Sequence, residues 1–337
     1  MIADRYYYNQ LNEQEKRIYV QFYKGVLNQE TQILFPERVS QQSLDKVYQA
    51  MTEDNPHLYY LDQRHMKYAF SMFNTKIFPE YLYTKAQINT YNHQIEKQVA
   101  EIVTQLDILN ATESMKVKKI HDYIAKNISY DEGARCAINT NPVVAAHSII
   151  GFFMDKKAVC EGIAKAAKIL LNTVDVKCIY VSGKGIHETS KNHAWNIVKI
   201  NGKAYHFDFT WDIMGTQRGY TSYDYYALPD EAIRLDHTDF HDVPVCTAWD
   251  ENFFVRKQVV FSSIKRMKEY ISQKVANDER LIYFKIKPEA GASMENIAHD
   301  ATNYVLQLVS KDVVSWHVAT SCNAEQRIVK IILIPRV

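Results

Sequence analysis

The chain has 337 residues, of which 47% are apolar and 23% are charged, as in an ordinary soluble globular protein. This length allows a sizeable core and exceeds that of a single typical domain. The 40 Lys and Arg residues almost balance the 39 Asp and Glu residues. Partners such as nucleic acid or a membrane surface call for a large basic excess, so we expect neither of them.

The cysteines and the first residues bear on the compartment. The start, MIADRYYYNQ, lacks the basic flank and apolar stretch of a signal peptide. The longest apolar run, 143–154, is too short to span a membrane. No CxxC pair occurs, which favours neither a zinc ribbon nor a disulfide framework and fits a thiol-reducing compartment. We therefore predict a cytoplasmic protein. The five cysteines are widely spaced: Cys136, Cys160, Cys178, Cys246 and Cys322.

Residues 1–110 are predicted to form a mostly helical N-terminal region. Apolar residues recur at helical spacing over Leu11–Leu27 and Gln42–Thr52. Pro56 then introduces two aromatic segments, HLYYL and YAFSMF, which we predict to be short strands. A long amphipathic helix is predicted over 84–109, and we interpret it as a scaffold that packs on the core.

Residues 111–243 contain the candidate chemistry. A helix predicted over Glu113–Lys126 leads into NISYDEG, and AVCEGIAKAAKILL then places Cys160 just before an amphipathic helix. The unpaired N–H groups and the dipole at a helix start favour an anion, so a thiol there can ionise to the reactive thiolate. Cys160 is a candidate nucleophile if a base lies nearby. The alternative is a small apolar residue of the core.

A predicted β-hairpin, which follows a strand at 176–181, supplies that base. In HAWNIVKINGKAYHFDFTWD, Asn201-Gly202 lies between two alternating apolar runs, which is the strongest short-range hairpin signal. With a two-residue turn, His193 and Asp208 become diagonal neighbours on one face, about 7–8 Å apart at the backbone. A carboxylate that accepts the ring N–H fixes the tautomer and leaves the other ring nitrogen for a thiol.

Two further residues of the hairpin compete for these roles. His206 faces the same side but lies two steps nearer the turn than Asp208, and we interpret it as structural. Asp212 is the other diagonal neighbour of His193. Strand pairing alone therefore leaves Asp208 and Asp212 as alternatives for the carboxylate.

The pattern changes at residue 244, and we predict a small α+β domain over 244–337. We assign it no role. Its predicted elements are two helices and three strands: helices Phe261–Val275 and Ser293–Val309, and strands Leu281–Lys287, Val313–Ala319 and Arg327–Ile334.

One pair of histidines has a spacing known from metal sites. His237-x3-His241, in LDHTDFHD, could hold a metal if this stretch were helical. A third ligand is not evident, and acidic loops that contain His are commonly solvated. We therefore predict no metal.

Three blocks, taken together and in order, resemble a known family. KIHDYIAKNISYDEG, AVCEGIAKAAKILL and HAWNIVKINGKAYHFDFTWD resemble the transglutaminase-like core found in many bacterial proteins. The resemblance covers residues 113–228 and implies a papain-like α+β fold, in which a helix carrying Cys packs on an antiparallel sheet. The resemblance implies that Cys160 is the nucleophile, His193 the base and Asp208 the carboxylate that orients the base. It thereby selects Asp208 over Asp212.

The chain departs from the family pattern at two positions. Many members have an aromatic residue where this chain has Ile150 before Gly151, and where it has Ile163 after CEG. Neither belongs to the triad, but both bear on the groove and the oxyanion hole. A second oxyanion donor normally joins the backbone N–H of the nucleophile. Tyr130 is the candidate, and its alternative is a core tyrosine.

The resemblance implies an enzyme that needs no metal or organic cofactor. The thiolate of Cys160 would attack an amide carbonyl of a protein or peptide substrate and form a thioester acyl-enzyme. Water as the acceptor gives a peptidase or amidase, which we favour because bacterial members are regarded as protease-like. An amine acceptor gives a transglutaminase. The remaining alternative is a transglutaminase-like binding module whose thiol is idle.

Overall fold

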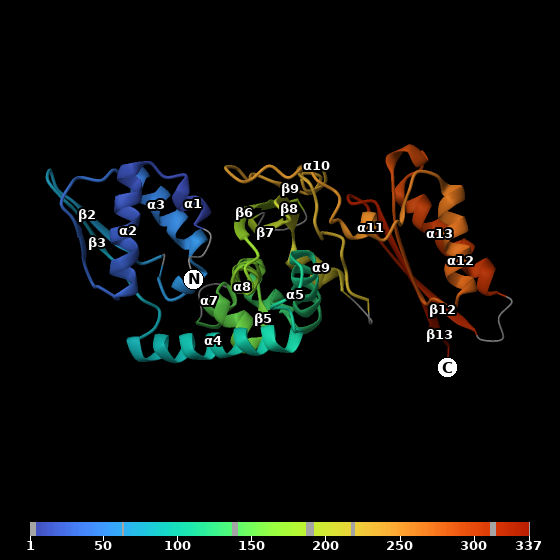
Figure 1. Cartoon of the computed structure of the whole chain (residues 1–337), viewed down its shortest axis with the longest axis horizontal. Coiled ribbons are helices and arrows are strands. Elements are labelled where there is room, and N and C mark those ends of the chain that lie inside the picture. The colour runs from blue at the N-terminus through green and yellow to red at the C-terminus, as the bar shows by residue number, and fades with distance from the viewer. Residues whose placement is uncertain are drawn as a thin grey trace.

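The computed structural model shows three groups of elements along its long axis (Figure 1). N-terminal helices and a small sheet lie at one end, a group around α8 lies in the middle, and a second sheet with two helices lies at the other end. Helices combined with mainly antiparallel sheets confirm the predicted α+β class. The structure describes residues 5–62, 64–136, 141–186, 192–216, 220–310 and 315–336.

In the N-terminal group, α2 packs on α3 and on a sheet of order β1-β3-β2. A capping box starts α2: the Asn12 side chain accepts the Glu15 N–H, and the Glu15 carboxylate accepts the Asn12 N–H. The elements are α1 (Tyr6–Asn9), α2 (Glu13–Leu27), β1 (Ile33–Phe35), α3 (Gln41–Asp54), η1 (Pro56–Leu58), β2 (Lys67–Phe70) and β3 (Thr75–Phe78).

The strand predicted for HLYYL is wrong. Pro56 opens a 3-10 turn, η1, because its fixed φ suits the first position of a helical turn. The segment contributes only an isolated bridge between Leu61 and Tyr81. The second aromatic segment, YAFSMF, does enter a strand, β2, through its first three residues.

Helix α4 (Lys85–Leu106) runs beneath the central group in Figure 1. Thr84 and Gln87 form its capping box. One face is buried, as expected of the predicted scaffold helix, through Ile88, Ile95, Val99, Ile102 and Val103. Neither this helix nor any other in the described ranges has the length and apolarity needed to cross a bilayer.

The central group packs α5 (Glu113–Asn127) and α8 (Cys160–Thr173) together, with α8 lying on a sheet of order β8-β7-β6-β9. The Asn196 side-chain amide donates to the Ala164 carbonyl at 3.0 Å and ties the sheet to α8. The remaining elements are β4 (Ser129–Tyr130), α6 (Glu132–Cys136), α7 (Asn141–Ala146), η2 (Gly151–Asp155), β5 (Lys157–Ala158), β6 (Cys178–Gly185), β7 (Asn192–Ile200), β8 (Lys203–Phe207), α9 (Phe209–Gly215), α10 (Asp230–Ile233) and β9 (His237–Thr238).

The β7–β8 hairpin has the predicted register through five residue pairs, ending at Asn196 and Phe207. Asn201 and Gly202 have φ values of 50° and 85°, the positive values that a tight hairpin turn of this kind requires. The two-residue turn read from the sequence is thus confirmed.

Beyond Phe207 the predicted pairing is wrong. Asp208 leaves the strand and caps α9, where its Oδ1 accepts the backbone N–H groups of Thr210 and Trp211 at 2.9 and 3.1 Å. Thr210, which a continued hairpin would place opposite His193, therefore lies in a helix. An Asp side chain satisfies the unpaired N–H groups of a helix start, and here this outweighs further pairing of the two strands.

The C-terminal group is a sheet of order β10-β11-β13-β12 packed against two helices. Alternate residues of β11, namely Ile282, Phe284 and Ile286, are fully buried. The predicted helices and strands are present with shifted ends, and residues 313–314 lie outside the described residues. The elements are α11 (Phe253–Arg256), β10 (Val260–Phe261), α12 (Ile264–Ala276), β11 (Leu281–Ile286), η3 (Pro288–Ala290), α13 (Met294–Val309), β12 (Trp316–Asn323) and β13 (Ile328–Pro335).

Gly162 marks the closest approach of α8 to the chain before it. A Cβ atom there would lie 2.5 Å from the Ala146 carbonyl oxygen and 2.7 Å from that of Ser148. We expect Gly162→Ala to lower the free energy of unfolding by about 1–3 kcal/mol, because backbone atoms must shift. Urea denaturation measures this change.

Gly133→Ala, in α6, is the matched control. Its Cβ would meet only Asp131 Oδ1, at 3.4 Å, so the higher helix propensity of Ala should leave stability unchanged or raise it by up to about 1 kcal/mol. Equal stabilities of the two variants would contradict the close packing at Gly162.

Candidate active site

Cys160 is the first residue of α8. Its thiol is half-buried and packs against Ala164, Tyr180 and Ala194. Val159 occupies the cap position and makes no side-chain cap bond. The N–H groups and the dipole of the helix start are therefore directed at the region of the thiol, where they stabilise a negative charge.

His193 in β7 and Asp208 after β8 form the central hydrogen bond of the site. Nε2 of His193 lies 2.7 Å from Oδ2 of Asp208, and both side chains are fully buried. Cys160 lies close enough to the same imidazole to contribute to its raised pKa. The structure thus brings together the three residues that the sequence proposed, with His193 between the thiol and the carboxylate.

The electrostatics of this group favour an imidazolium. Burial alone would lower the pKa of His193, but the charge and hydrogen bond of Asp208, together with those of Cys160, raise that pKa to about 10. Burial would raise the pKa of Asp208, yet His193 and His237 hold it well below its usual range. An imidazole whose charged form is stabilised in this way is suited to take the proton of the thiol, which leaves a thiolate beside an imidazolium.

The two competing residues of the hairpin have other partners. Asp212 Oδ2 lies 2.9 Å from Nε2 of His121 in α5, and both side chains are buried. His206 accepts the indole N–H of Trp195 at 3.0 Å and contacts Asp230 at 2.8 Å. Of the two carboxylates that strand pairing left open, Asp208 is the one that contacts His193.

Two indole rings enclose His193. The ring of Trp211 stacks on the imidazole at a centroid distance of 5.0 Å and an angle of 24°, and that of Trp195 lies at 6.0 Å and 22°. Stacked faces restrict rotation of the imidazole and keep water away from its hydrogen bond with Asp208. The sequence reasoning missed Trp211, although its position three residues after Asp208 was a usable signal.

His237 is the second residue that the sequence reasoning missed. Its Nε2 lies 3.2 Å from Oδ2 of Asp208, and its Nδ1 lies 2.6 Å from Oδ1 of Asp236. The helix needed for a His237-x3-His241 metal pair does not form, because residues 237–238 are strand β9 and His241 is exposed.

Two groups of described side chains have metal-like spacing: His193, Asp208 and His237, and His206, Asp230 and Cys246. In the first group, the carboxylate hydrogen-bonds both imidazoles. In the second, Asp230 contacts the His206 ring and accepts the backbone N–H of Cys246. These bonds account for the short separations, and we assign no metal to either group.

Tyr130, the predicted oxyanion donor, lies close to the start of α8. Its strand β4 pairs with β5, which places Tyr130 opposite Ala158, two residues before Cys160. Its ring packs beside Val159 and Ala146. The oxyanion role stays a prediction.

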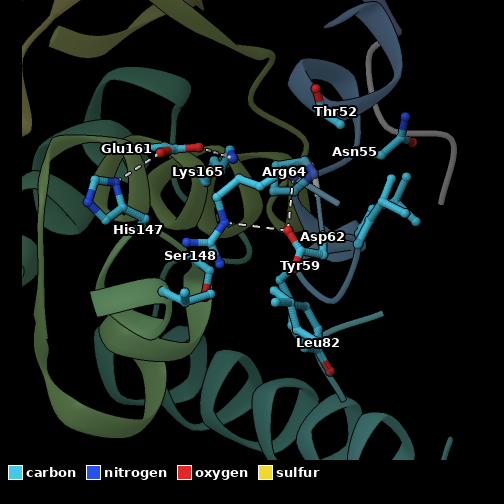
Figure 2. A pocket seen from close by; sticks show the side chains of 14 residues that line it. Thr52, Asn55, Tyr59, Asp62, Arg64, Leu82, His147, Ser148, Glu161 and Lys165 are labelled. Carbon is cyan, nitrogen blue, oxygen red and sulfur yellow. Dashed lines mark hydrogen bonds and ion pairs between the residues drawn. The ribbon is translucent and has the colours of Figure 1, made fainter. Parts of the chain in front are cut away.

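A cavity of about 300 Å³ opens between η1 and α8. Figure 2 shows Glu161, the neighbour of Cys160, on one side of this cavity and Asp62 on the other, with the Arg64 side chain extending from the Asp62 side towards Ser148. Glu161 pairs with His147 at 3.2 Å and with Lys165 at 2.5 Å. The apolar lining of the cavity includes Leu58, Tyr59, Leu61, Leu82 and Val144. The two positions where the chain departs from the family pattern, Ile150 and Ile163, are both buried in the core.

The N-terminal group is fastened to the core beside this cavity. The Tyr7 hydroxyl donates to the Tyr180 carbonyl at 2.7 Å, and the Ser182 hydroxyl donates to Glu53 at 2.9 Å. Because Tyr180 also packs against Cys160, the N-terminal helices form one wall of the region around the thiol.

Comparisons with known proteins agree with the sequence blocks. Residues 100–209 match the family model of the transglutaminase-like superfamily. A crystal structure of a TGase aligns at 16% identity and a TM-score of 0.33, over 57% of this chain and 53% of that one. A candidate cysteine protease from Cytophaga hutchinsonii aligns at 14% identity and a TM-score of 0.28, over 43% of this chain and 61% of its own.

This chain therefore covers less than two thirds of either solved structure. A comparison with curated proteins finds no match.

The electrostatics of His193 can be measured directly. We expect its imidazole to titrate near pH 10 in the intact protein, as followed by NMR of the ring nitrogens. Asp208→Asn should lower the pKa of His193 by about 1–3 units, because the opposite charge is lost while burial remains.

Asp212→Asn is the control for this measurement. Asp212 pairs with His121, so this variant should leave the pKa of His193 unchanged. An ordinary pKa for His193 in the intact protein, unaffected by Asp208→Asn, would rule out the ion pair.

Proposed function

We propose, from the transglutaminase-like domain that residues 100–209 form, that this protein is a cysteine-dependent acyl-transfer enzyme. Its substrates are amide bonds of proteins or peptides, and its principal activity is that of a peptidase or amidase. One observation carries the proposal: Cys160 opens α8 beside a buried His193 that is hydrogen-bonded to Asp208.

The first half of the reaction makes a thioester. The Cys160 thiolate attacks the amide carbonyl and forms a tetrahedral oxyanion, and we assign its stabilisation to the backbone N–H of Cys160 and the Tyr130 hydroxyl. The carbon–nitrogen bond then breaks, and His193 gives its proton to the leaving amine. The acyl group remains on the sulfur of Cys160.

The second half releases the acyl group. His193, now neutral, takes a proton from water, and the resulting hydroxide attacks the thioester carbonyl. The carbon–sulfur bond breaks, the product leaves as a carboxylic acid, and the thiolate and imidazolium are restored. Throughout, Asp208 orients the imidazole and stabilises its charged form.

The cavity between η1 and α8 supports a substrate of peptide chemistry. Its volume of about 300 Å³ is at the small end of ligand pockets and suits a side chain rather than a large cofactor. It combines an apolar lining with the paired charges of Glu161 and Lys165. A peptide bound along the cavity would have its backbone near the start of α8, because Glu161 and Lys165 of that helix line the cavity.

Thiol labelling tests the proposal. We expect iodoacetamide to modify Cys160 rapidly at about pH 6, where an ordinary thiol of pKa about 8.5 is less than about 1% ionised. His193→Ala and Asp208→Asn should slow this labelling by up to about a hundredfold, because the thiolate loses its imidazolium partner. Peptide mass spectrometry gives the rate at each cysteine.

Cys322 provides an internal control in every sample. Its thiol is exposed in β12, and the charged groups that shift its pKa are Asp224, Glu325, Lys330 and Arg327, so its labelling should not respond to either substitution. If Cys160 shares the pH profile of an ordinary thiol and ignores both substitutions, the enzyme proposal fails. The binding-module alternative would then lead.

The acceptor is tested separately. With a peptide library in ¹⁸O-labelled water, we expect one ¹⁸O atom in the new carboxylate and no product with Cys160→Ser, because a hydroxyl does not form the thiolate pair. A fluorescent primary amine is added in a parallel reaction. Its incorporation into the peptides, without ¹⁸O uptake, would identify a transglutaminase instead.

A further inference from the structure

The carboxylate of Asp208 holds two imidazoles. Oδ2 lies 2.7 Å from Nε2 of His193 and 3.2 Å from Nε2 of His237, while Oδ1 accepts two backbone N–H groups of α9. The side chains of all three residues are completely buried. The carboxylate thus has four hydrogen-bond partners, of which the reaction above uses only His193.

The second imidazole continues the chain of contacts. Nδ1 of His237 lies 2.6 Å from Oδ1 of Asp236, which is also completely buried. Both ring nitrogens of His237 therefore face carboxylate oxygens. Two carboxylates alternate with two imidazole rings along this buried group.

Asp236, the last of these four side chains, is hydrogen-bonded to the C-terminal part of the protein. Oδ2 of Asp236 accepts the Tyr225 hydroxyl at 2.9 Å and the Gln326 side-chain amide at 3.1 Å. Gln326 is fully buried and lies in the turn between β12 and β13. The same amide also donates to the Ala232 carbonyl at 3.0 Å, which fixes the tip of this hairpin on the core.

A glycine permits the approach of β9. Strand β9 pairs with the end of β6 at Lys184 and Gly185. At Gly183, a Cβ atom would lie 2.7 Å from both the Thr238 carbonyl oxygen and the Trp195 ring. The missing side chain lets β9 carry His237 to the back of Asp208.

We propose that His237 and Asp236 are positioning residues of the thiol site, and that Gln326 anchors them from the C-terminal region. This inference rests on the proposed function. It gives the region beyond residue 244 a role, because its β12–β13 turn closes the interior behind the carboxylate. Loss of His237 removes one of the hydrogen bonds that hold Oδ2 of Asp208 in place and leaves the buried carboxylate with one donor fewer, so Asp208 no longer fixes the ring of His193 as firmly.

The test uses the full chain and the ratio of Cys160 alkylation rates at about pH 6 and about pH 9. An ordinary thiol is largely ionised at the higher pH and hardly at the lower one, so a high ratio indicates a thiolate–imidazolium pair. Changes in the access of the reagent to Cys160 affect both rates equally and do not alter the ratio. His237→Asn removes the donor to Asp208 and should lower the ratio by about ten- to a hundredfold. His237→Gln keeps a donor near the Nε2 position and should retain most of the ratio.

Gln326→Met tests the anchor at a distance from the thiol. It keeps the side-chain length and removes the amide donor, and we expect a severalfold fall in the same ratio. His206→Asn is the matched control, since His206 is also buried and bonded to a carboxylate, that of Asp230. It should lower the unfolding temperature without changing the ratio.

The outcomes separate the two proposals. Rapid labelling of the intact protein at about pH 6, with an unchanged ratio in His237→Asn and Gln326→Met, overturns the positioning role and leaves the proposed enzyme intact. Ordinary thiol behaviour of Cys160 in the intact protein overturns both. If His237→Asn does not fold, as judged by circular dichroism, the alkylation ratio of Gln326→Met decides whether the positioning role holds.

Discussion

A buried negative charge, that of Asp208, is the constraint on which the central part of the structure depends. An ion removed from water costs several kcal/mol unless opposite charges and hydrogen bonds replace its hydration. Four donors do so here: two imidazoles and two backbone N–H groups. Strand β8 ends at Phe207 and α9 begins at Phe209 because the residue between them must turn inward.

The two flanking groups act on opposite sides of this charge. The N-terminal helices reach the thiol side, where Tyr7 bonds to the Tyr180 carbonyl and the cavity next to Glu161 opens. The C-terminal sheet reaches the far side, where Gln326 contacts Asp236. The proposed covalent catalysis needs both a rigid interior and an accessible thiol, and separate parts of the chain would supply them.

The sequence predicted the elements whose signals are local. The hairpin register followed from Asn201-Gly202, and α8 followed from its apolar face. The end of β8 was not foreseen, because Asp208 can either cap a helix or continue the strand. Which of the two is more favourable depends on the free energy of the whole fold and cannot be read from the local sequence. His237 had no usable signal: its strand has two residues and meets Asp208 through tertiary packing alone. Strand pairing brought Asp208 within reach of His193 but could not exclude Asp212, and that choice came from the family resemblance.

The hydrogen bonds that complete the site span long stretches of chain. His237 and Asp208 are 29 residues apart, Gln326 and Asp236 are 90 apart, and Tyr7 and Tyr180 are 173 apart. Contacts of this kind form late in folding, because the entropy of closing a long loop must be overcome first. During synthesis Cys160 emerges well before residue 326, so a growing chain carries its thiol before the interior behind Asp208 is closed. On the proposed function, the thiol of a growing chain stays inactive until residue 326 has joined the fold.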